Sequence, residues 1–305
     1  MTDSAAVDRV RAAGRRMFDE IYATSPAICV VHPVSRLRCV VLPLYASTMW
    51  ALRTVAHEGN VTSVAGFAAR QLVEEAARWD WAADAGLSEN EKVRRGNGLM
   101  RDMRRSRRRV LRAAAAAGFH EAQISAFVKP GGYDVVDLSE GSVEGEPVPM
   151  SPAEALGRIR VNGPEGPGWL ITAYSVLSQL THQTPLGVLH GYESNGADIS
   201  AGSLSGPMEA LAIDTAVTAA SRLLWCIGTL LIGAMWGSDR ARFDLDAYYE
   251  WRMVARRHAD AVHQLAAPIH GIFGPDHEPF RTLGRNEPCL CRSARKAKHC
   301  HGSVR

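Results

Sequence analysis

Apolar residues recur at intervals of three and four along most of this chain, which is the spacing of one face of an α-helix. Ala and Leu outnumber β-branched residues in these stretches, which favours helix over strand. We therefore expect a mostly α fold, an irregular helical bundle. The pattern predicts helices over residues 4–21, 48–58, 64–85, 89–117, 151–159, 169–184 and 207–236, and over a last stretch that begins at 244 and is ended by Pro268.

Three stretches interrupt this pattern. Residues 127–152 are rich in glycine, proline and acids, and predict a long loop with room for one short strand. Residues 192–205 predict a Gly/Ser-rich loop, and residues 274–283 have no periodicity and are typical of a tether. Where the loop of residues 127–152 ends, Ser151 and Glu154 form the capping-box pattern that marks the start of a helix. We expect a helical domain over residues 1–273, whose function the pattern does not indicate, then the tether and a small element over residues 284–305.

The composition is that of a soluble globular protein, with 46% hydrophobic and 22% charged residues and a formal net charge of +3. The first residues lack the basic, apolar and small-residue order of a signal peptide. The longest apolar run, residues 223–237, is too short to span a bilayer core of ~30 Å, so we expect a buried core helix there. Cys29, Cys39 and Cys226 lie in apolar contexts that are typical of buried thiols. We expect a cytoplasmic protein that does not insert into a membrane.

A cluster of metal-binding residue types lies near the carboxyl end, in the stretch GRNEPCLCRSARKAKHCHG. Cys289, Cys291, Cys300 and the adjacent His301 supply three thiolates and one imidazole, a complete tetrahedral set for one Zn²⁺ ion. Four protein ligands leave no position for water, so the site is expected to be structural, and metal binding would supply the folding energy of so short a segment. His299 is a second imidazole beside Cys300, so the choice of histidine stays open. The alternative is a chance cluster of free thiols in a basic tail.

The same stretch resembles the SEC-C motif, the small zinc element at the carboxyl tail of the SecA protein-export ATPase, which is also appended to many other bacterial proteins. The Gly-Arg-Asn lead, the proline before the first cysteine, the Cys-x-Cys spacing and the closing Cys-His-Gly all match. Carried over by position, the resemblance implies that the zinc ligands are Cys289, Cys291, Cys300 and His301.

Leu290, Arg292 and Ala294 depart from the usual SEC-C pattern without removing a ligand. In SecA the element contacts the SecB chaperone and the ribosome. The resemblance therefore implies that this tail docks onto a protein or ribosomal partner.

A basic stretch lies between Lys92 and Arg112, where ten positions are Lys or Arg and Asp102 is the single acid. Such a stripe attracts phosphates, although a solvated face, or pairing with acids elsewhere in the chain, is the alternative. The glycine and apolar spacing that follows is that of a helix-turn-helix, although Pro130 shortens its second helix. Residues 92–129 therefore predict possible nucleic-acid binding as an alternative function. The residues that share one helix face are Arg101, Arg104, Arg105, Arg108 and Arg112.

Polar residues also recur at helical spacing in two apolar stretches. Arg70 and Glu74 lie one turn apart, and Tyr174, Ser178 and His182 share a face of a second helix. These residues are expected to form a buried polar network, which either serves a function or fixes the register of the helices. The combination resembles helical bacterial families of unknown function that carry SEC-C tails.

An enzymatic alternative depends on Arg257 and His263, in the stretch RRHADAVH. Their spacing resembles the Arg–His signature of HEPN-type ribonucleases, helical proteins that cleave RNA as dimers. An arginine can stabilise the charge of a reacting phosphate while a histidine transfers protons. Arg252 and His258 give the same spacing, and no phosphate loop, Ser elbow or His-Glu-x-x-His helix is present. The sequence favours a zinc-binding interaction or adaptor protein, with an enzyme as the alternative.

Overall fold

The computed structural model describes residues 4–25, 29–30, 36–57, 63–84, 86–118, 151–156, 168–181, 192–195, 198–232, 241–242 and 244–271. Most of them are helical, which confirms the predicted fold class. The predicted tether and zinc element lie outside these residues. The helices are α1 (Ser4–Ala23), α2 (Arg36–His57), α3 (Ser63–Ala82), α4 (Glu89–Ala116), α6 (Pro152–Leu156), α7 (Gly168–Thr181), α9 (Gly206–Ile232) and α10 (Leu245–His270).

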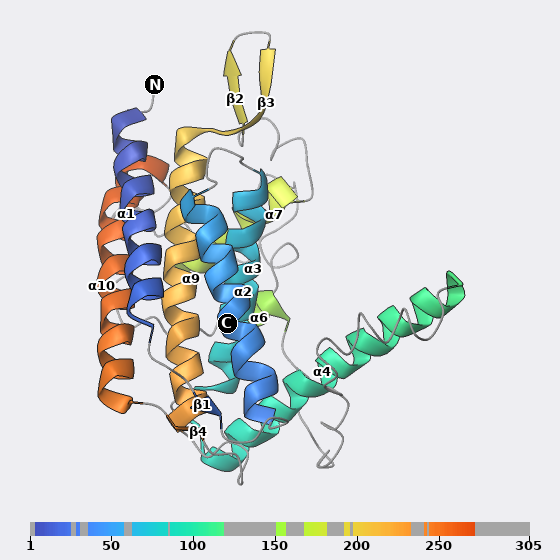
Figure 1. Cartoon of the computed structure of the whole chain (residues 1–305). Helices are drawn as coiled ribbons and strands as arrows, with labels where there is room; N and C mark the ends of the chain where they lie inside the picture. Colours follow the sequence, from blue (N-terminus) through green and yellow to red (C-terminus); the bar gives the residue numbers. More distant parts are fainter. Residues whose placement is uncertain are drawn as a thin grey trace, which may run out of the picture.

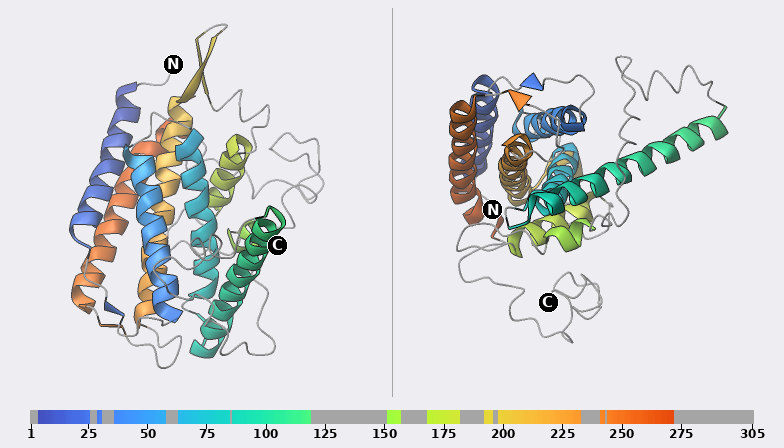
Figure 2. Two further views of the ribbon diagram at one scale, coloured as in Figure 1. Left: turned by 45° about the vertical axis from the view of Figure 1, so that its right-hand side comes forward. Right: turned by 90° about the horizontal axis from the view of Figure 1, so that it is seen from below.

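Helix α9 lies at the centre of the bundle and packs on α1, α2, α3 and α10 (Figure 1). α1 and α10 lie side by side on one side of α9, and α2, α3 and α7 lie on the other (Figure 2). α10 runs antiparallel to α9, since Tyr248 near its start reaches Leu224 and His263 near its end reaches Asp214. α10 also binds α1, because the indole Nε1 of Trp251 donates to the carbonyl of Ile21 at 2.9 Å.

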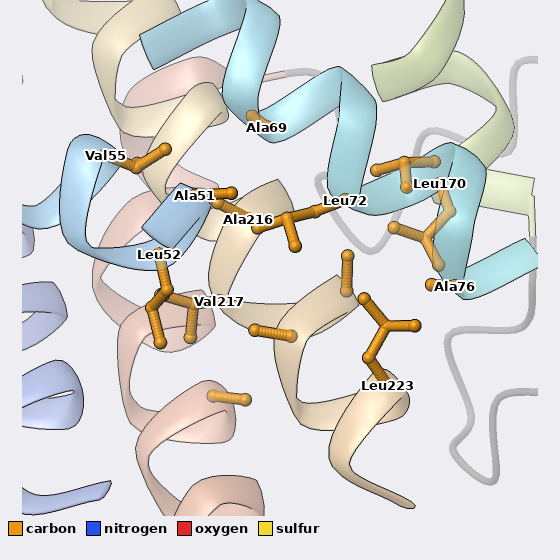
Figure 3. Packing of buried hydrophobic residues seen from close by; sticks show 14 of the residues in the cluster. Ala51, Leu52, Val55, Ala69, Leu72, Ala76, Leu170, Ala216, Val217 and Leu223 are labelled. Atoms are coloured by element: carbon orange, nitrogen blue, oxygen red, sulfur yellow. The ribbon is translucent and has the colours of Figure 1, made fainter. Parts of the chain in front are cut away.

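The core of the bundle is built mainly from Leu and Ala. Leu72 and Ala76 of α3, Leu170 of α7 and Leu223 of α9 lie together in it (Figure 3). Small residues such as alanine let helices pack closely, and Gly228 of α9 faces a neighbouring side chain directly. A Cβ there would overlap the Tyr248 ring of α10, so only glycine fits.

Helix α9 is also long and apolar enough to cross a membrane. Its residues 206–228 have a mean hydropathy of 1.4, but 78% of that window is buried inside the protein. The helix also carries Glu209 and Asp214, both buried. This degree of enclosure by neighbouring helices is that of a core helix. Within the predicted apolar run, residues 223–237, the described side chains of Leu223, Leu224, Cys226 and Ile227 are buried.

Two short strand pairs complete the described fold. β1 (Cys29–Val30) pairs antiparallel with β4 (Ala241–Arg242), which joins the end of α1 to the start of α10. β2 (Tyr192–Asn195) pairs antiparallel with β3 (Asp198–Leu204). The prediction of a Gly/Ser-rich loop over residues 192–205 was therefore wrong. Asn195 pairs with Asp198, and the Asn195–Gly196 dipeptide between the strands is a hairpin signal that the loop interpretation missed.

Two helix ends were predicted from local sequence signals, the start of α6 and the end of α10. The Glu154 amide donates to Ser151 Oγ at 3.3 Å and the Ser151 amide donates to Glu154 Oε2 at 3.1 Å, so the predicted capping box is confirmed. Pro268 does not end the last helix as predicted. The helix continues to His270 and is closed by Gly271, which has a φ of 60° and whose amide donates to the Ala267 carbonyl.

Candidate functional site

The predicted zinc ligands Cys289, Cys291, Cys300 and His301 lie outside the described residues. Three thiols and an imidazole are the donor set of a structural zinc site, so the residue types fit that ion. In the part of the chain that the structure describes, no group of three His, Cys, Asp or Glu side chains is arranged to hold a metal. Cys226 is no alternative ligand, because burial raises the pKa of its thiol to about 12 and keeps it protonated.

The predicted polar network is partly present between α3 and α7. Arg70 Nη2 lies 2.9 Å from Glu74 Oε1, and the Tyr174 hydroxyl donates to the same oxygen at 3.2 Å. The Arg70 guanidinium also lies over the Tyr174 ring, 5.5 Å from its centroid. Ser178 Oγ is buried with no hydrogen-bond partner among the described residues, and His182 lies outside them. The network therefore links the two helices through Glu74.

A second polar cluster connects α9 to α10. The Asp214 carboxylate is fully buried, and its Oδ2 lies 2.8 Å from His263 Nδ1 and 3.1 Å from His270 Nε2. The two histidines are seven residues apart, so they lie on one face of α10. The His263 ring, 18% exposed as a side chain, packs against Trp169 of α7 with centroids 5.3 Å apart. We call Asp214, His263 and His270 the Asp214 cluster.

Asp214 Oδ2 faces one ring nitrogen of each imidazole. A carboxylate oxygen accepts a hydrogen bond from a ring N–H, so the tautomers with hydrogen on His263 Nδ1 and on His270 Nε2 satisfy this geometry. Each imidazole is thereby held in one orientation. Orientation of this kind is used for proton transfer in enzymes, but a buried carboxylate needs donors in any protein. The cluster holds α10 against the centre of the bundle.

The predicted pair Arg257 and His263 is not brought together within one chain. Six positions correspond to about 240° around the helix, and Arg257 is exposed while His263 contacts Asp214. In the second pair with this spacing, Arg252 lies over the Trp225 ring and His258 Nε2 lies 2.7 Å from Glu20 Oε2. The described residues add no evidence for the ribonuclease alternative.

The basic stretch forms helix α4, whose start is firmly held. Ser88 caps it by accepting from the Glu91 amide at 3.3 Å. Glu91 accepts from Arg94 at 2.6 Å and from Arg95 at 3.1 Å, and the Arg95 hydrogen bond lowers the pKa of Glu91. Arg95 also donates to the Trp81 carbonyl at 2.8 Å. Both arginines near the start of α4 are therefore engaged within the protein.

Beyond Leu99, the last buried residue described on α4, the helix leaves the bundle (Figures 1 and 2). Arg112 is exposed, as is Arg109 one turn earlier. The positions of Arg101, Arg104, Arg105 and Arg108 are helical, but their side chains lie outside the description. The rest of the helix-turn-helix-like segment, residues 119–129, also lies outside it.

Long-range ion pairs are the features that sequence reasoning missed. Arg11 of α1 binds Glu209 of α9 in a bidentate manner, with Nε–Oε1 and Nη2–Oε2 distances of 2.7 and 2.8 Å. Arg222 of α9 binds Asp80 of α3; burial raises the pKa of Asp80, and Arg222 partly offsets this effect. Acids and an arginine inside the apolar α9 stretch were the available signal, but their partners lie in other helices.

Comparison with protein families identifies the tail. The model of the SEC-C motif family matches residues 285–303, a range that contains all four predicted zinc ligands. The match does not extend into the helical bundle. No solved structure matches the chain.

Proposed function

We propose that this chain is a zinc-binding interaction protein whose SEC-C motif docks the helical domain onto a protein or ribosomal partner in the cytoplasm. The observation that carries the proposal is the SEC-C match at residues 285–303, at the end of a chain whose described part is a helical bundle.

The donor set supports a structural zinc ion. Cys289, Cys291, Cys300 and His301 fill a tetrahedral shell, so no position is left for a catalytic water. A segment of this length has too little apolar surface to fold without the metal. The ion would therefore act by holding a small surface in shape.

The charge of the tail suits a negatively charged partner. Residues 284–302 contain five Lys or Arg residues and one acid, Glu287. Basic residues on a rigid, metal-held element favour association with acidic protein surfaces or with ribosomal RNA. The described helices pack around α9 and share one apolar core.

The metal content of purified protein tests the site and the choice of histidine. The full chain should hold one zinc per molecule, and Cys289→Ser with Cys300→Ser should hold none. His301→Ala should lose zinc or bind it far more weakly, while the matched variant His299→Ala keeps it. Full zinc retention by the double serine variant would overturn the site, and loss in His299→Ala alone would move the fourth ligand to His299.

Sedimentation with purified ribosomes through a sucrose cushion tests docking. The full chain should co-sediment, and the double serine variant should remain in the supernatant although its circular dichroism shows an intact bundle. Equal co-sedimentation of both forms would contradict docking through the zinc element. If neither form co-sediments, the ribosome is excluded and the proposal rests on a protein partner.

A further inference from the structure

The outer half of α4, residues 100–116, is strongly basic, and the proposed function does not use it. Between residues 100 and 116 the sequence has seven Arg, no Lys and one acid, Asp102. At 1.5 Å per residue this segment is about 25 Å long. In Figure 1 and in the right-hand view of Figure 2 it extends away from the other helices.

The helical register separates two sides of this segment. Leu99, 6% exposed, starts a line of positions that continues through Met103 and Val110 at intervals of four and seven. Six arginine positions fall within an arc of about 140° centred on the opposite side of the helix axis, at 100° per residue. Those positions are Arg101, Arg104, Arg105, Arg108, Arg109 and Arg112.

The helices around the start of α4 offer no spare acid. α4 packs on α3, whose three acids all have partners: Glu74 binds Arg70, Glu75 binds Arg78 and Asp80 binds Arg222. On α4 itself, Glu91 is occupied by Arg94 and Arg95. The acids of α3, and Glu91 on α4, are therefore already engaged, and the outer half contains one acid, Asp102, among seven arginines.

We propose that the outer half of α4 binds the phosphodiester backbone of nucleic acid. An α-helix fits the major groove, which is ~12 Å wide, and a duplex carries one phosphate charge per ~1.7 Å of its axis. All the basic residues of the segment are arginines, whose planar fork binds phosphate oxygens in a bidentate manner. Backbone contacts of this kind give affinity without sequence preference.

Fluorescence anisotropy with the full chain tests this proposal. The probes are a fluorescein-labelled 20-base-pair DNA duplex and a labelled 20-nucleotide RNA, each titrated between 50 and 300 mM salt. With roughly five phosphate contacts, the slope of log K against log salt should be about −4.5 for the duplex and about −3.5 for the RNA. The lower of the two dissociation constants at the same salt concentration shows which backbone the helix prefers.

A matched pair of variants assigns the binding to α4. Arg105→Gln, Arg108→Gln and Arg112→Gln together should weaken binding on the order of tenfold or more and flatten the duplex slope by about 2.7. The same three positions changed to Lys should retain most of the binding. The control changes three exposed arginines of the bundle, Arg16, Arg53 and Arg256, to Gln and should bind like the unmodified chain.

The basic tail is present in every variant, so a difference between the two triple variants belongs to α4. Equal weakening by both triple variants, or no binding to either probe at 50 mM salt, would overturn the proposal. Competition by polyglutamate as strong as by unlabelled duplex, at equal charge concentration, would overturn it in favour of an acidic protein partner.

Discussion

Asp214 Oδ2 lies 2.8 Å from His263 Nδ1, so a fully buried carboxylate at the centre of the bundle meets an imidazole of the outer helix α10. The same oxygen also accepts from His270 Nε2 at 3.1 Å. Asp214 of α9 thus contacts α10 at two points, His263 and His270, which lie two helical turns apart on one face. These two contacts fix the position of α10 along α9. Charged hydrogen bonds in a buried place are among the stronger polar contacts in a protein.

Asp214→Asn should therefore destabilise the protein. The amide cannot accept two charge-assisted hydrogen bonds at one oxygen as the carboxylate does, and we expect a loss of about 1–3 kcal/mol in the free energy of unfolding. Urea unfolding followed by circular dichroism measures it. Asp260→Asn, on the exposed side of α10, should change stability by less than ~0.5 kcal/mol. Similar values for the two variants would show that the Asp214 cluster does not hold α10.

Gly228→Ala should be one of the most damaging small substitutions in the bundle. Its new Cβ would overlap the Tyr248 ring, which is fixed by a hydrogen bond to the Leu224 carbonyl, so we expect a loss of about 1–3 kcal/mol. Gly66→Ala is the matched control, because its Cβ would lie 3.5 Å from Leu180 Cδ1, at ordinary contact distance. That change should be neutral or stabilising by up to ~1 kcal/mol. Relative to the unmodified chain, the thermal unfolding midpoint of Gly228→Ala should fall, and that of Gly66→Ala should stay the same or rise.

Glu75 makes the folding stability of the protein depend on pH, in a direction that follows from its raised pKa. Burial raises the pKa of Glu75 above its ordinary value of 4.5, and Arg78 only partly opposes this. The folded state therefore holds the proton at pH values where the unfolded chain has lost it. Stability falls as the pH rises from about 4.5 through the folded pKa, and the loss is then complete.

Glu75→Gln removes this dependence, so its stability relative to the unmodified chain should rise with pH across that window and then level off. Urea midpoints measured from pH 4 to pH 8 test the prediction. A stability difference that stays constant over this range, or that runs in the opposite direction, would show that Glu75 ionises as readily in the folded protein as in the unfolded chain.

The α3–α7 link is testable by a double-mutant cycle on Tyr174 and Glu74. Tyr174→Phe removes the hydroxyl that donates to Glu74 Oε1, and should cost about 0.5–1.5 kcal/mol. When Glu74 is already Gln, the same change should cost less, because the charged acceptor is gone. An equal cost in both backgrounds would mean that the hydroxyl contributes nothing through Glu74.

The parts of the fold that could be predicted are those that depend on signals between residues close in the sequence. The capping box at Ser151 and the apolar period of α1, α3 and α4 depend on residues within a few positions of one another, so one sequence contains them. α2 begins at Arg36, twelve positions before its predicted start, because Val40, Val41 and Pro43 weaken the helical pattern there. The β2–β3 hairpin was missed because its glycine and serine content outweighed the Asn195–Gly196 signal.

The polar contacts likewise fall into those between residues close in the sequence, which could be predicted, and those between distant residues, which could not. Arg70 and Glu74 are one turn apart, and their pairing follows from helix geometry alone. Tyr174 is 100 residues from Glu74, and His263 is 49 residues from Asp214, so these contacts depend on how whole helices are placed. Periodicity gives the face that a residue occupies, but it does not give the helix that the face meets.

The central claim is that the zinc element connects the helical domain to a partner. The most direct test is affinity purification from native lysate with the intact chain and with a chain that ends at Leu283, with bound zinc assayed in each. We predict that the shortened chain loses one zinc per molecule and also loses a specific protein or the ribosome from its captured partners. Loss of zinc with an unchanged set of partners would contradict the claim.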